Sequence, residues 1–174
     1  MKPEFAFWAV PAIVLTVPSC GWAVTYLSVE QAQQIIFPGA SFTSQQLELS
    51  VEQKKAIEKK SGIRVRLKKQ PIWKVNQGGW FLLDEVLGKH EFIVYAIGLN
   101  ADGSVRQIEI LDYRETYGHE IRNKNWRQQF VGKTSASSLK LDRDIKNISG
   151  ATLSCRHIAD GVKRLLALYD ICLK

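Results

Sequence analysis

The residues best suited to chemistry form one short run of small and hydroxyl-bearing side chains, Ser149-Gly150-Ala151-Thr152-Leu153-Ser154. Glycine and alanine let the backbone approach a ligand closely. A helix is expected to follow the run directly, and the free N–H groups at the positive end of a helix attract an anion. Thr152 and Ser154 add hydroxyl groups. The run therefore predicts either a phosphate-binding turn or an ordinary helix cap made by a small polar side chain.

The other residues that could support metal or disulfide chemistry are scattered. Cys155 and Cys172 lie on the same expected helix, so a rise of ~1.5 Å per residue places them about 25 Å apart. Bridged Cα atoms must lie within about 7 Å, so we expect two free thiols. His90, His119 and His157 do not cluster, and the chain has no Cys-x-x-Cys. We therefore predict no structural metal.

The charge of the chain bears on the class of its partners. The 174 residues carry a net charge of +7, but the basic residues are spread along the chain. Nucleic-acid binding requires a concentrated basic surface and a recognisable module, so we expect no nucleic acid partner. A basic surface suits an anionic cofactor, a redox partner or a membrane surface instead.

Residues 1–23 have the pattern of an export signal. Lys2 precedes an apolar run from Phe5 to Val17. Gly21-Trp22-Ala23 then places small residues at the −3 and −1 positions of a cleavage site. A membrane anchor over this region and a lipoprotein signal at Cys20 are the alternatives. All three place residues 24–174, expected to form a single domain, in the periplasm or elsewhere outside the cytoplasm.

Two short helices are predicted near the start of this domain. Ser28 with Gln31 and Ser50 with Gln53 have capping-box spacing. The first helix is expected to end near residues 37–39, at Phe-Pro-Gly, and the second at Ser61-Gly62.

Strands and a final helix complete the expected fold. Alternation of apolar and basic residues predicts a strand over 63–68, followed by an extended segment over 73–75. Further strands are expected over 80–86, 91–99 and 105–113, joined by short turns into an antiparallel meander. An apolar stripe then predicts a C-terminal amphipathic helix, its members being Ile158, Val162, Leu165, Leu166 and Tyr169. The fold class is therefore α+β.

The stretch Ile148–Leu166 resembles the flavinylation motif of the FMN-binding domain family. This family includes the extracytoplasmic flavin subunits of the sodium-pumping quinone reductase and of related ferredoxin-linked membrane complexes. The resemblance implies that FMN is attached to Thr152 through a phosphoester, with Ser154 as the alternative hydroxyl. It also implies maturation by a flavin transferase that uses FAD and a divalent metal. The other implied cofactor-binding residues of the motif are Ser149, Gly150, Ala151 and Leu153.

A second stretch is similar to the same family. Glu115-Thr116-Tyr117-Gly118 and the later Gly132-Lys133 look like its Glu-Thr-x-Gly and Phe-x-Gly-Lys segments, which face the flavin. The resemblance implies that Trp126 or Tyr117 packs on the flavin ring. It implies that Lys133 or Arg127 balances the charge of the phosphate or of the reduced flavin. The cofactor contacts expected from this region are Glu115, Thr116, Gly118, Trp126 and Lys133.

One residue departs from the family pattern. The family usually has an acidic residue three positions before the Ser/Thr of the motif, and this chain has Lys146 there. Asp144, two residues earlier, is a candidate to replace that acid. If the acid guides the transferase, flavinylation of this chain is inefficient or recognition differs.

Three functions follow from these observations. The leading hypothesis is an exported electron-transfer flavoprotein, in which FMN passes electrons between a membrane reductase and an extracytoplasmic acceptor. Such a protein is an electron carrier or a component of a reductase complex rather than a stand-alone catalyst. A module of the same fold that binds a ligand or partner without covalent flavin is the alternative, supported by Lys146. A reductase whose FMN directly reduces a small acceptor is the third.

Overall fold

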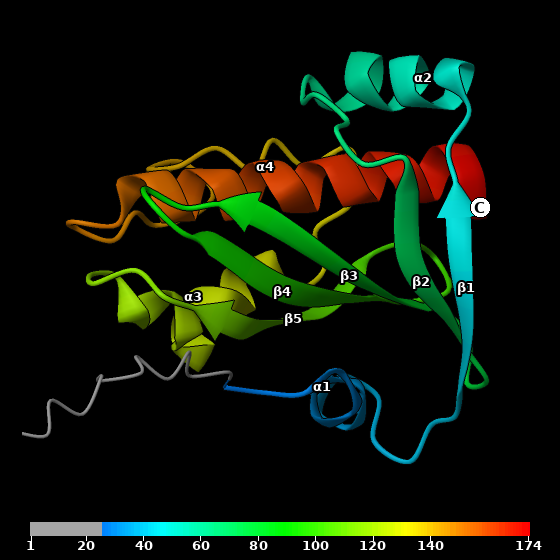
Figure 1. Ribbon diagram of the computed structural model, residues 1–174, viewed down its shortest axis with the longest axis horizontal. Helices are drawn as coiled ribbons and strands as arrows, with labels where there is room; N and C mark the ends of the chain where they lie inside the picture. Colours follow the sequence, from blue (N-terminus) through cyan, green and yellow to red (C-terminus); the bar gives the residue numbers. More distant parts are fainter. Residues whose placement is uncertain (1–25) are drawn as a thin grey trace, which may run out of the picture.

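The computed structural model describes residues 26–174, in which a five-stranded antiparallel sheet has helices on both faces (Figure 1). The strands neighbour one another in chain order, and they are β1 (Phe42–Glu48), β2 (Lys69–Val75), β3 (Trp80–Leu87), β4 (Phe92–Leu99) and β5 (Val105–Tyr113). The predicted α+β class and antiparallel meander are confirmed. Within residues 26–174, none of the helices has the length and apolar character that crossing a membrane requires. The predicted export signal lies outside the described residues.

Both N-terminal helices start at the predicted capping boxes. Ser28 caps α1 (Val29–Ile36) and Ser50 caps α2 (Val51–Ser61). In each, the serine oxygen accepts a hydrogen bond from the backbone N–H three residues on, and the glutamine there bonds back to the serine N–H. A box of this kind satisfies N–H groups that the helix leaves free. α2 ends at Gly62, whose φ of 74° lies in the left-handed region that glycine adopts without strain.

The strand predicted over 63–68 is wrong, because this segment forms bends and irregular structure and β2 starts only at Lys69. Its side chains alternate between half-buried and exposed, which is the pattern that suggested a strand. Its backbone bonds elsewhere, however, and the Val65 N–H donates to the Glu58 carboxylate at 2.8 Å. Sequence patterns also failed to predict β1, which pairs with β2 at one edge of the sheet. The side chains of β1 are mostly exposed, so they lack an apolar alternation.

The C-terminal helix α4 (Thr152–Leu168) crosses one face of the sheet, and α1 lies against the opposite face (Figure 1). The predicted apolar stripe is buried, with exposures of 5% or less at Ile158, Val162, Leu165, Leu166 and Tyr169. Burying an apolar side chain of this size contributes ~1.5–3 kcal/mol. After Leu168 the chain continues as a wider helical turn, η3 (Tyr169–Leu173). The Tyr169 hydroxyl donates to the Ala101 carbonyl at 2.7 Å, which ties this turn to the β4–β5 turn.

A buried ion pair fixes the position of α4 on the sheet. Arg164 of α4 and the Tyr95 hydroxyl of β4 both donate to one oxygen of Asp84 in β3, each at 2.6 Å. The other Asp84 oxygen is buried without a hydrogen-bond partner. Burial and the neighbouring Asp84 carboxylate raise the pKa of Tyr95 well above its ordinary value. Gly161 passes close over this group, since a Cβ there would lie 2.4 Å from the Tyr95 hydroxyl.

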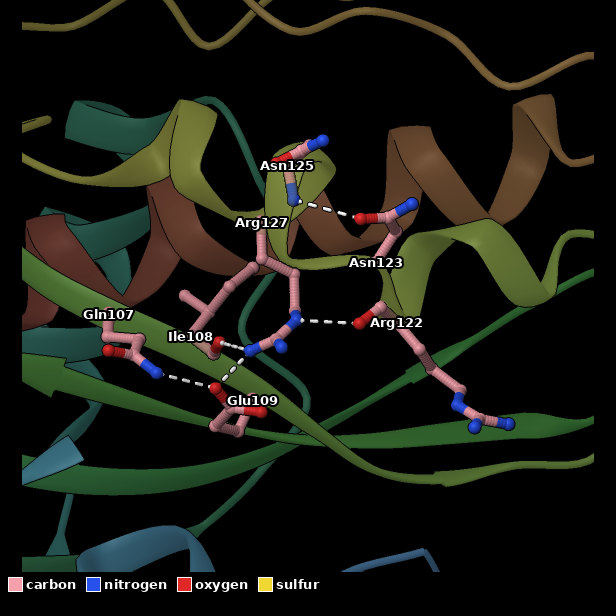
Figure 2. Close-up of polar contacts among 7 residues, drawn as sticks. All are labelled: Gln107, Ile108, Glu109, Arg122, Asn123, Asn125 and Arg127. Atoms are coloured by element: carbon pink, nitrogen blue, oxygen red, sulfur yellow. Dashed lines mark hydrogen bonds and ion pairs between the residues drawn. The ribbon is translucent and has the colours of Figure 1, made fainter. Parts of the chain in front are cut away.

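A short helical segment covers the outer edge of β5. It consists of η1 (His119–Arg122), α3 (Lys124–Arg127) and η2 (Gln128–Phe130). Figure 2 shows how Arg127 lies along this edge, where it donates to the Ile108 carbonyl at 2.7 Å and pairs with the buried Glu109 carboxylate. Gln107 donates to the same Glu109 oxygen at 2.6 Å. Because an open edge strand is a template for pairing with other chains, this segment protects β5.

Cys155 lies in α4 and Cys172 in η3, and both thiols are free. Burial raises the pKa of the Cys155 thiol. A thiol that stays protonated is a poor nucleophile and metal ligand, so Cys155 acts as a packing residue of the core.

The ion pair between α4 and β3 gives a first prediction. Arg164→Met removes the partner of the buried Asp84 carboxylate, so we expect the free energy of unfolding to fall by about 3–5 kcal/mol. Urea denaturation measures this loss. Arg156→Met, on an exposed position of the same helix, is the matched control, with an expected change within about 0.5 kcal/mol. Similar losses in the two variants would contradict the role given to the pair.

Candidate functional site

The turn before α4 makes Thr152 the first helical residue. Gly150 has a φ of 81°, a conformation that residues with a Cβ rarely adopt. The Ala151 N–H donates to the Ile148 carbonyl at 3.0 Å, which closes the turn. The Cys155 N–H then donates to the Ala151 carbonyl at 3.0 Å as the first bond of the helix. The chain therefore reverses at Gly150 and enters α4 at Thr152.

The first turn of α4 has no side-chain cap. The N-cap residue is Ala151, and no side chain of residues 26–174 accepts a hydrogen bond from the free N–H groups of the first turn. These groups carry the partial positive charge of the helix end. Of the two interpretations of this run, the ordinary helix cap is wrong, and the anion-binding turn stays a prediction.

An open pocket of ≈ 330 Å³ lies at this end of α4. Three segments that are distant in sequence line it, namely the β3–β4 turn, the loop after β5 and the turn that leads into α4. The lining residues are Lys89, His90, Glu115, Thr116, Tyr117, Gly150, Ala151, Thr152, Leu153 and Ser154. The fold thus brings together the two stretches that the sequence singled out, and Ser149 lies in the exposed turn beside them.

Glu115 fixes the loop after β5 to the β3–β4 turn. Its Oε1 accepts hydrogen bonds from the N–H groups of His90 at 2.6 Å and Glu91 at 3.1 Å. Burial alone raises the pKa of this carboxyl, but the backbone N–H groups outweigh it and hold the pKa below its ordinary value. Glu115 is therefore an ionised residue that holds the wall of the pocket in place.

Gly118 and Tyr113 hold the same loop against the turn before α4. Gly118 has a φ of 89°, and a Cβ there would lie 2.2 Å from the Ala151 Cβ. The Tyr113 hydroxyl donates to the Tyr117 carbonyl and lies 3.5 Å from the Ser154 Oγ. Any side chain at position 118 would push the loop away from α4. The glycine of the Glu-Thr-x-Gly stretch is therefore required by packing.

The two candidate hydroxyls differ in their surroundings. Ser154 is 3% exposed, and its Oγ lies beside the Tyr113 hydroxyl. Thr152 is half-buried, and its Oγ1 accepts a hydrogen bond from the Asn147 Nδ2 at 3.0 Å. Thr152 is therefore the hydroxyl that a ligand in the pocket reaches more easily.

Trp126, Lys133 and Arg127 do not line this pocket. Trp126 is buried, and its Nε1 donates to the Lys146 carbonyl at 2.8 Å. The Lys133 carbonyl accepts from the Val105 N–H at the far end of β5. At ~3.3 Å per residue, that end lies roughly 26 Å from the end of β5 beside the pocket. Arg127 is held by Glu109 at the edge of β5. Their positions give no support to the predicted flavin contacts of these three side chains.

Asp144, the candidate to replace the missing acid, is bound within its own loop. Its Oδ2 accepts from the Ser138 hydroxyl and from the Lys140 N–H, the latter at 3.2 Å. The Ser138 hydrogen bond holds the pKa of Asp144 below its ordinary value. Asp144 does not line the pocket, and the Lys146 side chain is exposed.

Sequence reasoning missed three residues of the site. Lys89 and His90 lie on the β3–β4 turn, which meets α4 only through the fold. Asn147 contacts the Thr152 hydroxyl from outside the recognised motif. The sequence signal for the first two was the predicted turn at Gly88-Lys89, and a turn residue by itself does not indicate which loops it will meet.

Comparison with known proteins supports the resemblance. Residues 88–167 match the model of a family described as FMN-binding domain. The matched range includes the β3–β4 turn, the loop after β5 and the start of α4. All three segments that line the pocket therefore lie within the matched range. A search among curated proteins found no match.

The hydrogen bonds of Glu115 give a second prediction. A pKa that is lower in the folded state means that ionised Glu115 stabilises the fold above the unfolded pKa of about 4.3. This stabilisation is lost as the pH falls through the folded-state pKa. Glu115→Gln is therefore expected to cost about 1.5–3 kcal/mol at pH 7 and progressively less below about pH 4.

Thermal unfolding of both proteins from pH 7 to pH 3 measures this difference. Glu120→Gln, at an exposed carboxylate of η1, is the control and is expected to follow the unmodified protein. A gap between Glu115→Gln and the unmodified protein that stays constant over this range would show that the charge of Glu115 does not stabilise the fold.

Proposed function

From the match of residues 88–167 to the FMN-binding domain family, we propose that the chain carries FMN covalently on Thr152 and acts as an exported electron-transfer flavoprotein. The observation that carries the proposal is the position of the Thr152 hydroxyl. It lies in an open pocket, at a helix start whose N–H groups have no side-chain cap. Such a helix end favours the phosphate of a phosphoester.

The surroundings of Thr152 fit a flavin phosphate. Gly150 is exposed, and an ideal Cβ there would meet nothing within 4 Å, so the backbone of the turn is accessible at this residue. Lys89, on the rim of the pocket, adds a positive charge. The phosphate would therefore meet N–H donors, a helix end and a cation in one place.

Attachment is a transfer reaction that balances without electrons. The Thr152 Oγ1 bonds to the phosphorus on the flavin side of FAD, the bond from that phosphorus to the bridging oxygen breaks, and AMP leaves. The hydroxyl proton passes to a base, which we assign to the flavin transferase. Glu115 is the carboxylate that lines the pocket in the described part of the chain, and its Oε1 already accepts hydrogen bonds from two N–H groups. We therefore do not assign the role of the base to Glu115.

Two exposed apolar side chains offer a surface for the flavin ring. Tyr117 is 74% exposed and Leu153 is 41% exposed, and both line the pocket. A planar ring packs favourably on an aromatic side chain. Of the two aromatic candidates from the sequence, the position of Tyr117 supports this role, since Trp126 is buried elsewhere.

The open pocket suits an electron carrier better than a stand-alone catalyst. FMN, when bound, supplies one- and two-electron chemistry. A ring held in an open site stays within reach of a protein partner, here a membrane reductase on one side and an extracytoplasmic acceptor on the other. A covalent tether also keeps the cofactor outside the cytoplasm, where a released flavin would be lost.

Thr152→Ala tests the attachment. After co-expression with a flavin transferase, the unmodified chain and Ser154→Ala are expected to gain FMN, and Thr152→Ala is expected to gain none. Intact mass and flavin fluorescence on a denaturing gel measure the covalent product. Flavin on Thr152→Ala would move the site to another residue. An unmodified chain without flavin would favour the alternative, a module of the same fold that binds without covalent flavin.

Tyr117→Ala tests the surface for the ring. A stacked tyrosine quenches flavin emission, so the flavinylated variant is expected to fluoresce more strongly than the flavinylated unmodified protein. Phe92→Ala is the matched control, because Phe92 is also exposed, at 55%, but does not line the pocket. Equal emission from Tyr117→Ala and Phe92→Ala would mean that the ring does not pack on Tyr117.

A further inference from the structure

We propose that Asn147 is a positioning residue, which holds the Thr152 hydroxyl in place for flavin attachment. The inference rests on the proposed function and adds to it the side chain that orients the acceptor oxygen. It starts from the one polar side chain contact of that oxygen in the described part of the chain, the Asn147 Nδ2 at 3.0 Å from Thr152 Oγ1.

The contact restricts the rotation of the acceptor. Thr152 is β-branched, so its oxygen occupies one of a few staggered positions about χ1. A hydrogen bond from Asn147 selects the position in which Oγ1 faces the amide. The Oγ1–H remains free to donate, and a base of the transferase can therefore remove its proton.

Asn147 is held in place by its neighbour in sequence. The Lys146 carbonyl accepts from the Trp126 Nε1 at 2.8 Å, and the Lys146 N–H donates to the Gln129 Oε1 at 2.7 Å. Trp126 is 6% exposed and therefore fixed in the core. Both polar groups of the peptide backbone at Lys146 are thus fixed one residue before Asn147. This arrangement gives Trp126, which does not line the pocket, an indirect part in the site.

The second polar atom of the Asn147 amide supports a role beyond stability. Asn147 Oδ1 is buried and has no hydrogen-bond partner in the part of the chain that the structure describes. Leaving a buried acceptor unpaired costs about 1–3 kcal/mol. A polar group kept at such a cost beside a reactive oxygen is expected to serve the reaction.

No carboxylate of the described chain takes this place. Lys146 stands where the family has its acid, and its side chain is exposed. Asp144 is bound to Ser138 and Lys140, and Glu115 to the β3–β4 turn. A neutral amide does not take up a proton, so Asn147 orients the hydroxyl without acting as a base.

Asn147→Ala measures the contribution to attachment. The purified domain without flavin, a flavin transferase, FAD and a divalent metal are combined, and kcat and KM for the domain are determined. Misplacement of a reacting group by about 1 Å costs on the order of 100-fold in rate, so we expect kcat to fall by roughly 10- to 100-fold with KM unchanged. Asn125→Ala, at an exposed asparagine of α3, is the control and is expected to keep both constants.

Asn147→Asp distinguishes positioning from loss of structure. It keeps the shape of the side chain but reverses the hydrogen bond, because the carboxylate accepts from the Thr152 hydroxyl. The hydroxyl is still oriented, so we expect kcat within about threefold of the unmodified chain. A carboxylate beside the hydroxyl should also make the rate rise with pH through its own pKa. If Asn147→Ala fails to fold, Gln129→Ala is expected to lower kcat in the same direction, because it removes the acceptor of the Lys146 N–H together with a hydrogen bond to the Trp126 carbonyl.

Nuclear magnetic resonance of the flavin-free domain gives a readout independent of attachment. Three-bond couplings at Thr152 are expected to report one χ1 rotamer in the unmodified chain and averaged rotamers in Asn147→Ala. An Asn147→Ala domain with unchanged kcat, or with lowered kcat but a single rotamer, would overturn the inference. If the unmodified chain accepts no flavin, the proposed function fails, and the rotamer comparison still decides whether Asn147 orients Thr152.

Discussion

The position of α4 on the sheet is the constraint on which the site depends. Its apolar stripe is buried against one face, and the pair of Arg164 with Asp84 fixes the helix along its length. With that position fixed, the start of α4 reaches the end of the sheet where the β3–β4 turn and the loop after β5 meet. Thr152 is thus placed in part by an ion pair that lies more than three helical turns away from it.

The site at that end combines rigid walls with an unsatisfied helix start. Glu115 and Gly118 hold the loop after β5 against its neighbours, by hydrogen bonds in one case and close packing in the other. The helix end itself is left without a side-chain cap. A helix start with rigid walls and free N–H groups is suited to a covalently attached anion. The open pocket would leave the ring of the proposed flavin within reach of a redox partner.

The sequence predicted what depends on local patterns. Capping boxes at Ser28 and Ser50 and the stripe of α4 are local signals, and the structure confirms them. β1 was not predicted because a polar edge strand is defined by its partner, and the strand over 63–68 was wrong because alternation reports burial and not pairing. The contact of Asn147 with Thr152 depends on the hydrogen bonds that Trp126 and Gln129 make to the Lys146 backbone. Because these two residues are distant in sequence, no local pattern predicts the contact.

The central claim is that the start of α4 holds a flavin through one hydroxyl. Tandem mass spectrometry of peptides from the chain co-expressed with a flavin transferase tests this most directly, because it locates the modified residue in an unaltered protein. We predict a peptide that carries the mass of FMN less one water, with the fragment ions placing the addition on Thr152. Unmodified peptide throughout, or an addition located on Ser154 or any other residue, would contradict the account.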